Sequence, residues 1–310
     1  MKKTELGRTG LQVSQLGFGA APVGYLGEDV KRTGDILNTL LDAGMNLIDT
    51  AACYPNSEQL IGEAVGNRRE EFILVSKCGH QAGNLSGPEW SSKLIRDSVD
   101  RSLRQLKADC IDVMLLHSCE ESILRRGEAL SALVRAREAG KIRFAGYSGD
   151  NQDAAYAATL DDVAVIETSI SICDQANIDA VLPGTQEHEV GVLVKRPIAN
   201  ACWRNPSDQR GVYQGYAEPY TRRFAAMGLN LSDLDTGETS GSRWAETALR
   251  FTLSIPGVNC ALIGTTNPQN AAANLAAAEL GPLPGEIVEK IRTSFKNAQA
   301  RSGGDWPGLT

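Results

Sequence analysis

Residues 46–77 read NLIDTAACYPNSEQLIGEAVGNRREEFILVSK and contain a short apolar run, an amphipathic stretch and a second apolar run, in that order. Residues 46–49 and 72–76 have the length and composition of strands, whereas residues 58–65 carry apolar side chains at helical spacing. A strand, a helix and a second strand at this spacing predict a βαβ unit, whose two strands are parallel.

The same alternation extends over the rest of the chain. We expect strands over residues 15–18, 46–49, 72–76, 112–116, 142–147, 164–167, 191–195 and 260–263. The stretches between them predict helices over residues 31–43, 58–65, 91–106, 122–139, 153–160, 244–253 and 268–278. Eight such strands in 310 residues favour an α/β fold of the (β/α)8 TIM barrel type over an open doubly wound sheet.

Two segments lie outside this alternation. Residues 3–19 place a Gly-Arg-Thr-Gly turn between two alternating stretches, which predicts an N-terminal β-hairpin that closes one end of the barrel. A long loop, residues 198–242, follows strand seven and is rich in Pro, Gly, Tyr and polar residues, so it is either a lid or binding loop or a surface insertion. Because no linker interrupts the chain, we expect residues 1–310 to form a single domain.

Charge and composition exclude several classes of protein. Lys and Arg number 31 against 38 Asp and Glu, giving a net charge of −7, and no basic block suggests nucleic-acid binding. No apolar run approaches the roughly 20 residues that span a bilayer, and the start lacks a signal peptide, so we expect a cytoplasmic protein. The seven cysteines include no C-x-x-C pair and there are only three histidines, so we expect neither a disulfide framework nor a metal site.

Three consecutive predicted strands each have an ionisable residue at or directly after their carboxyl end, and the residue type differs from strand to strand. Asp49 ends the first, Lys77 the second and His117 the third, and Tyr54 lies in the loop after Asp49. The carboxyl ends of barrel strands share one rim, so these four side chains are expected to meet there. The other two histidines, His80 and His188, are expected at the surface.

These four residues make chemical sense as a group. The phenol of Tyr54 has a pKa near 10 in water, and Lys77 would stabilise the phenolate that proton donation leaves behind. Asp49 would pair with Lys77 and keep it charged, while a neutral His117 would hydrogen-bond a carbonyl oxygen. The set is a general acid with a site for a carbonyl oxygen, and it lacks both an activated nucleophile and a metal, so the other reactant must be a cofactor.

The stretch GMNLIDTAACYPNSEQLIG, residues 44–62, resembles the first signature of the aldo-keto reductases, and Lys77 and His117 fall where that family has its other two catalytic residues. The resemblance runs from the hairpin to IGTTNPQNAAAN at residues 263–274. It implies a barrel enzyme that binds a nicotinamide cofactor in extended form and reduces a small aldehyde or ketone to an alcohol without a metal.

The resemblance also implies how the adenosine end of the cofactor is held. Gly264 and Thr265 lie in the loop after strand eight, where Thr265 and Asn270 would meet the ribose phosphate and Asn274 the adenine. Asn270 is shorter than the Arg or Gln of many members and carries no charge, and Gly264 replaces a Lys found in some. We expect NADPH because the family favours it and helix N-terminal amides can bind phosphate, with NADH as the alternative.

Four residues at the ends of strands five to seven are implied on the nicotinamide side. Ser148 would meet the carboxamide, and Glu167 stands where Gln is common. Lys195 replaces a Tyr that often stacks on the nicotinamide, and we hypothesise that Lys195 and Glu167 neutralise each other. Arg196 is interpreted either as a contact to the cofactor pyrophosphate or as a solvated strand end.

Several features of the function stay open. Tyr25 and Trp203 are candidates for the substrate pocket, although loop aromatics also pack their own loops. Besides a carbonyl reductase with Tyr54 as proton donor, the sequence is compatible with a cofactor-binding sensor or regulatory protein of slow turnover. A lyase that forms a Schiff base through Lys77 is disfavoured, because Asp49 would keep Lys77 protonated. The sequence sets neither the carbonyl substrate nor the oligomeric state.

Overall fold

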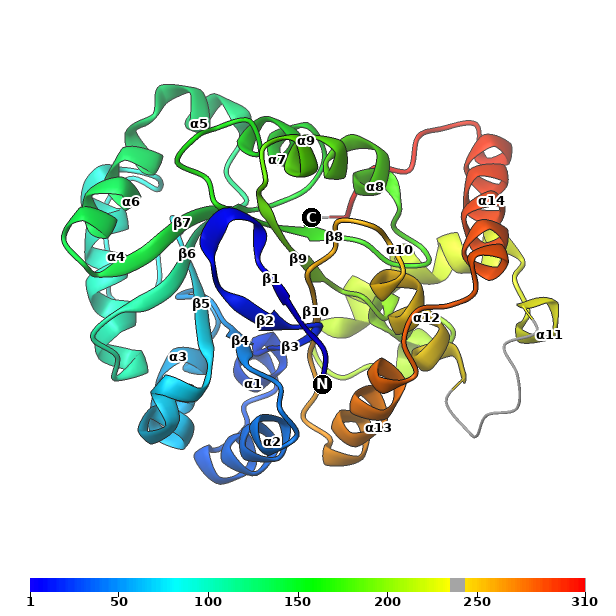
Figure 1. Ribbon diagram of the computed structural model, residues 1–310, viewed down its shortest axis with the longest axis horizontal. Coiled ribbons are helices and arrows are strands. Elements are labelled where there is room, and N and C mark those ends of the chain that lie inside the picture. The colour runs from blue at the N-terminus through cyan, green and yellow to red at the C-terminus, as the bar shows by residue number, and fades with distance from the viewer. Residues whose placement is uncertain (235–242, 310) are drawn as a thin grey trace.

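The computed structural model describes residues 1–234 and 243–309 and contains the expected barrel (Figure 1). Eight parallel strands close in the order β10-β3-β4-β5-β6-β7-β8-β9. Their bounds are β3 (Leu16–Gly19), β4 (Leu47–Asp49), β5 (Ile73–Cys78), β6 (Ile111–His117), β7 (Ile142–Ser148), β8 (Val165–Ser169), β9 (Gly191–Lys195) and β10 (Cys260–Ile263). All eight predicted strands are confirmed to within a few residues.

The strand register aligns the polar residues at one rim of the barrel. His117 pairs with Ser148, Ser148 pairs with Glu167, and Ser169 pairs with Lys195. Beneath this rim the barrel is filled by apolar side chains, among them Leu47, Val75, Val113, Leu115 and Leu193. The packed interior therefore leaves the carboxyl rim as the place where these polar side chains gather.

The helices form an outer ring around the strands (Figure 1). Those that were predicted are α2 (Val30–Asp42), α3 (Ser57–Val65), α4 (Ser92–Leu106), α7 (Asn151–Ala157), α12 (Arg243–Leu253) and α13 (Pro268–Glu279). The helix predicted over residues 122–139 is instead two, α5 (Glu121–Arg126) and α6 (Glu128–Glu138), because Gly127 has a left-handed φ of 73°. Helices not predicted are α1 (Ala21–Tyr25), α8 (Ala176–Ala180), α9 (Leu182–Glu187) and α14 (Gly285–Ser302).

The expected hairpin closes the amino-terminal end of the barrel. Strands β1 (Lys3–Glu5) and β2 (Gln12–Ser14) pair antiparallel, and Figure 1 shows this blue hairpin lying across the barrel. Leu6, Leu11 and Val13 join the apolar cluster of the barrel interior. The hairpin therefore covers the amino-terminal end of the barrel core, at the end opposite the polar rim.

The long connection after β9 contains more structure than a loop. It includes α10 (Tyr213–Met227) and α11 (Leu231–Leu234), and α10 buries Ala217, Tyr220 and Met227. Residues 235–242 of the predicted loop lie outside the described residues. The described part of this connection is therefore a packed helical segment and not an extended loop.

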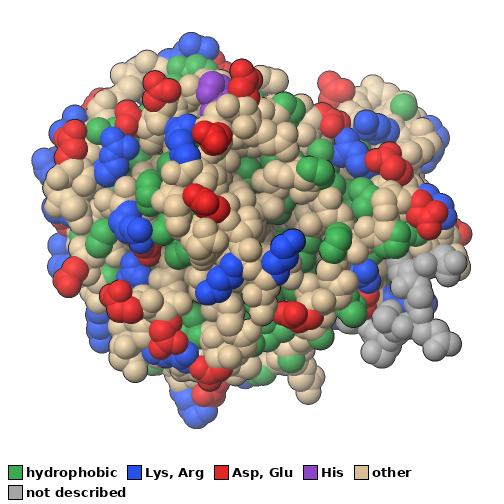
Figure 2. All heavy atoms as spheres, in the orientation of Figure 1, with side chains coloured by type: hydrophobic (Ala, Val, Ile, Leu, Met, Phe, Trp, Pro, Cys, Tyr) green, Lys and Arg blue, Asp and Glu red, His purple; other side chains and the backbone are tan. Residues whose placement is uncertain are grey.

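The surface matches the mixed charge of the sequence. Figure 2 shows Lys and Arg side chains interspersed with Asp and Glu on the face it displays. In the described ranges no helix is long and apolar enough to cross a bilayer, and no group of three or more His, Cys, Asp or Glu residues is placed to hold a metal ion.

The contact between the hairpin and β9 can be tested at Gly7, with Gly10 as the matched control. Both glycines have left-handed φ angles, 52° and 71°, so alanine costs about 1 kcal/mol of backbone strain at either position. A Cβ on Gly7 would also lie 2.2 Å from the backbone nitrogen of Gly191, whereas one on Gly10 has no atom within 4 Å. We expect urea unfolding to show Gly7→Ala less stable than Gly10→Ala by at least about 1 kcal/mol, and equal losses would contradict the described hairpin contact.

Candidate active site

Asp49, Lys77, His117 and the loop residue Tyr54 lie together at the carboxyl rim of the barrel. The Nζ of Lys77 lies 2.5 Å from the Asp49 Oδ1 and 5.5 Å from the centre of the Tyr54 ring. The ring centres of Tyr54 and His117 are 5.9 Å apart, with the rings edge to face. Asp49 and Lys77 are buried, whereas Tyr54 and His117 are partly exposed. A buried charged pair therefore supports two groups that a ligand can reach.

Lys77 contacts two carboxylates rather than one. Besides Asp49, the Glu167 Oε2 lies 3.2 Å from its Nζ, and the ammonium donates a hydrogen bond to the Thr50 carbonyl oxygen at 3.0 Å. The hypothesis that Glu167 pairs with Lys195 is wrong, because Lys195 pairs with the Asp150 Oδ2 at 3.0 Å. The reason is the register: Lys195 is level with Ser169, two residues beyond Glu167 along β8.

This arrangement controls the protonation of Lys77 and Tyr54. Burial disfavours the ammonium of Lys77, but the carboxylates of Asp49 and Glu167 outweigh burial and raise its pKa. Burial raises the pKa of the Tyr54 phenol, and the nearby Lys77 charge only partly opposes it. Burial, together with the charge of Glu167, also raises the pKa of Asp49 well above its usual range. The free protein thus holds a charged Lys77 beside a protonated Tyr54.

His117 is a neutral imidazole in this environment. Burial lowers its pKa well below the usual value, and the positive charge of Lys77 lowers it further. Its Nδ1 lies 3.4 Å from the Cys53 Sγ. This thiol therefore touches one ring nitrogen and leaves Nε2 as the nitrogen for a ligand.

His80 is partly exposed, as expected for a surface residue, and it also borders the site, which was not predicted. Its ring centre lies 5.6 Å from that of His117 and 4.8 Å from that of Trp90. Its Nδ1 lies 3.2 Å from the Glu89 Oε1. The available signal was its position three residues after Lys77, on the same rim.

The residues assigned to the nicotinamide side line the adjoining strand ends. Ser148 is buried at the end of β7 and donates a hydrogen bond to the Glu167 Oε1 at 3.4 Å. Arg196 follows β9 with a left-handed φ of 58° and lies 5.5 Å over the ring of Tyr216. It also donates a hydrogen bond to the Leu309 carbonyl oxygen, so the interpretation as a solvated strand end is wrong.

The residues assigned to the adenosine end gather at the start of α13. The Thr265 Oγ1 accepts a hydrogen bond from the Asn267 backbone N–H at 3.1 Å. Asn274 is buried and Asn270 is exposed, while an added Cβ on Gly264 would lie 2.9 Å from the Pro22 Cγ. This loop is packed closely against α1 and presents polar groups at a helix N-terminus, which favours an anion.

Sequence reasoning missed a cation at the same place. Arg32 of α2 donates a hydrogen bond from Nε to the Thr266 carbonyl oxygen at 3.0 Å and pairs with Glu28 at 3.2 Å. The two segments are more than 230 positions apart in the chain. No local pattern signals such a contact.

The two substrate-pocket candidates have different surroundings. The ring centre of Tyr25 lies 5.5 Å from that of Tyr54, so Tyr25 borders the site. Trp203 instead stacks on Trp244 of α12 at 6.3 Å and packs against an outer apolar cluster. Its role in the substrate pocket therefore stays a prediction, and its ring has a packing partner on α12.

Comparison with known proteins identifies the family of the chain. The sequence model of the Aldo/keto reductase family matches residues 15–295, so the chain belongs to that family and is an oxidoreductase of the aldo-keto reductase type. The family resemblance inferred from the residues is thereby confirmed.

Several individual proteins are similar over nearly the whole chain. The uncharacterized oxidoreductase YqkF of Bacillus subtilis is 28% identical, with 96% of this chain and 97% of the relative covered. L-galactose dehydrogenase of Arabidopsis thaliana is 27% identical, over 88% and 86%. The holo form of aldo-keto reductase AKR11C1 from Bacillus halodurans superimposes with a TM-score of 0.79 at 27% identity, covering 95% of this chain and 96% of that one.

The contact between Glu167 and the buried Lys77 makes a prediction about pH. Burial raises the pKa of the Tyr54 phenol most, and the negative charges of Asp49 and Glu167 raise it further, so Glu167→Gln should lower that pKa. A proton donor loses activity as it ionises; the fall of kcat/KM at alkaline pH should therefore begin at lower pH in the variant than in the wild type.

The measurement is the kcat/KM of carbonyl reduction between pH 6 and 10.5. Glu138→Gln, an exposed site on α6, is the matched control and should keep the wild-type profile. If Glu167→Gln also keeps that profile, Glu167 does not act on the proton donor.

Proposed function

We propose that the protein is an NADPH-dependent carbonyl reductase in which Tyr54 donates the proton. The observation that carries this proposal is the contact of Tyr54 with a buried, charged Lys77 and a neutral His117. When bound, the nicotinamide cofactor supplies a hydride to the carbonyl carbon of a small aldehyde or ketone. Tyr54, in the loop after β4, supplies the proton, and His117, at the end of β6, holds the carbonyl oxygen.

The residues around the site fit a phosphorylated cofactor. Lys195 ends β9 and Arg196 follows it, and Arg32 and the N-terminal amides of α13 lie at the other end of the expected path. Ser148 and Glu167 would orient the carboxamide, with Glu167 accepting from its NH2 group. The site thus offers cations and donors locally, although the protein as a whole is acidic.

The proton transfer follows from the charges around Tyr54. As negative charge develops on the carbonyl oxygen, Tyr54 gives up its proton, and the ammonium of Lys77 stabilises the phenolate. Asp49 and Glu167 keep that ammonium charged and in position. The neutral His117 donates a hydrogen bond from Nε2 to the same oxygen, which requires the tautomer with the proton on that nitrogen.

The role of Tyr54 is tested by Tyr54→Phe, with Tyr156→Phe on α7 as the matched control. Loss of the general acid should reduce kcat for an aldehyde panel by about 100-fold or more, because the variant keeps the ring but has no proton to donate. Its affinity for NADPH, measured by fluorescence titration, should stay near that of the wild type.

Near-normal turnover in Tyr54→Phe would contradict the assignment. A wild-type protein that binds NADPH tightly but reduces no member of a panel of aldehydes, ketones and aldoses would instead favour the sensor or regulatory function.

The proposed preference for NADPH rests on the cation beside the adenosine end of the site. Arg32 would compensate for the uncharged Asn270 by facing the 2′-phosphate, so Arg32→Gln should weaken NADPH about threefold to fivefold. NADH lacks this phosphate, and its affinity should hardly change. Fluorescence titration with both cofactors measures the ratio, with exposed Arg96→Gln as control, and an equal loss for both cofactors would contradict the role of Arg32.

A further inference from the structure

The carboxyl-terminal residues 306–309, called the strap below, return to the polar rim of the barrel. After α14 ends, the ring of Trp306 packs edge-on against Phe295 at 5.1 Å between ring centres. Arg223 of α10 lies 5.4 Å over the Trp306 ring and donates a hydrogen bond to the Pro307 carbonyl oxygen at 2.7 Å. These contacts direct the strap from the outer helices toward the strand ends.

Gly308 enters a tight space beside β7 and α8. It exchanges two backbone hydrogen bonds with the side chain of Asn151, at 2.6 Å from its N–H and 3.0 Å to its carbonyl oxygen. A Cβ at this position would lie 2.7 Å from the Asn177 Nδ2 and 2.9 Å from the Asp150 Cβ. The approach is therefore close enough to require glycine.

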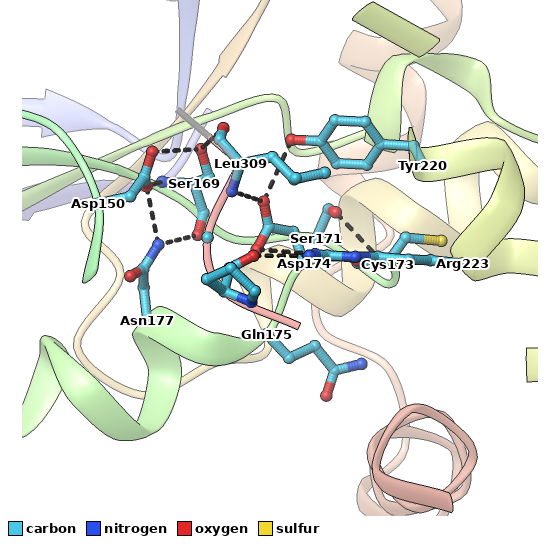
Figure 3. Close-up of polar contacts among 12 residues, drawn as sticks. Asp150, Ser169, Ser171, Cys173, Asp174, Gln175, Asn177, Tyr220, Arg223 and Leu309 are labelled. Atoms are coloured by element: carbon cyan, nitrogen blue, oxygen red, sulfur yellow. Dashed lines mark hydrogen bonds and ion pairs between the residues drawn. The ribbon is translucent and has the colours of Figure 1, made fainter. Parts of the chain in front are cut away.

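Leu309 is held between two buried side chains (Figure 3). Its N–H donates to the Asp174 Oδ2 at 3.0 Å, and that carboxylate also accepts from the Tyr220 hydroxyl at 3.2 Å. Its carbonyl oxygen accepts hydrogen bonds from the Ser169 hydroxyl and from the guanidinium of Arg196. One residue thus links the ends of β8 and β9 to α10.

The contact with Arg196 places the strap next to the proposed cofactor. Arg196 has left-handed backbone geometry, which an arginine adopts only when its surroundings hold it there. Its guanidinium is fixed on one side by the Leu309 carbonyl oxygen and stacks on Tyr216. A guanidinium has five N–H donors, so one bond to the strap leaves others for a phosphate oxygen.

We propose that the strap is a positioning element of the nucleotide site, which holds Arg196 ready for the cofactor pyrophosphate through the Leu309 carbonyl. This inference rests on the proposed function, because it requires that the protein binds a nicotinamide nucleotide. Arg196 touches the phosphate, and Gly308 and Leu309 act through Arg196. Asp150 connects the same network to Lys195, since it pairs with that ammonium and accepts hydrogen bonds from Ser169 and Asn177.

The test uses the full chain and two glycines of the same tail. Gly308→Ala fills the tight space, whereas Gly304→Ala meets no atom within 4 Å and is the matched control. Loss of a charge-assisted contact corresponds to about a tenfold weaker Kd for NADPH in Gly308→Ala, with no change in Gly304→Ala. The Kd for adenosine 2′-monophosphate, which lacks every phosphate of the pyrophosphate, should stay unchanged in both.

A double variant shows whether the strap works through Arg196. Arg196→Gln alone should weaken NADPH about tenfold, and adding Gly308→Ala should cause no further loss. Multiplied losses of about a hundredfold, or an equal loss for NADPH and the 2′-monophosphate, would overturn the proposal, as would a Gly308→Ala variant that binds like the wild type.

If Gly308→Ala does not fold, Asn151→Gly replaces it in the same comparisons, because it removes both hydrogen bonds to Gly308 and tolerates the left-handed φ of 58°. The same outcomes support or overturn the proposal. A wild-type protein that binds neither NADPH nor NADH would reject the proposed function itself, which is a different result from a strap variant that binds normally.

Discussion

The buried ammonium of Lys77 is the interaction on which the active site depends. A charge inside a protein persists only when opposite charges and hydrogen bonds replace its water, and here Asp49, Glu167 and the Thr50 carbonyl oxygen do so. These partners come from two strands on opposite arcs of the barrel. Only closure of the barrel brings these groups to one point, so the geometry of the site depends on the fold.

The second carboxylate changes the electrostatics around Tyr54, the proposed proton donor. With Asp49 alone, Lys77 would form a neutral pair. Burial raises the pKa of both Asp49 and Tyr54 most, and the negative charge of Glu167 raises both further. The phenol is thus protonated in the free protein. The acidic composition of the chain fits the same picture, because phosphate is met by a few placed cations and not by a basic surface.

Local pattern predicted the strands and the residues at their ends well. Asp49, Lys77 and His117 were found because each ends or directly follows an apolar run, and the barrel rule then places such residues on one rim. What the sequence did not reveal are contacts made through space. The pairing of Glu167 with Lys77, the approach of Arg32 to Thr266 and the bond between Arg196 and Leu309 all join distant segments. The contact of His80 with His117 and the stacking of Trp203 on Trp244 were not predicted for the same reason, because packing sets the positions of these loops.

The central claim is that Tyr54, and not His117, gives the proton to the carbonyl oxygen. The direct measurement is the single-turnover rate of NADPH oxidation by an aldehyde, followed by stopped-flow between pH 6 and 10. A tyrosine donor beside neutral His117 predicts a rate that stays constant over this range, because burial raises the pKa of the Tyr54 phenol above its ordinary value near 10. A rate that declines with a midpoint near pH 6.5, the ordinary histidine pKa, would contradict the account, because it would identify the His117 imidazolium as the donor.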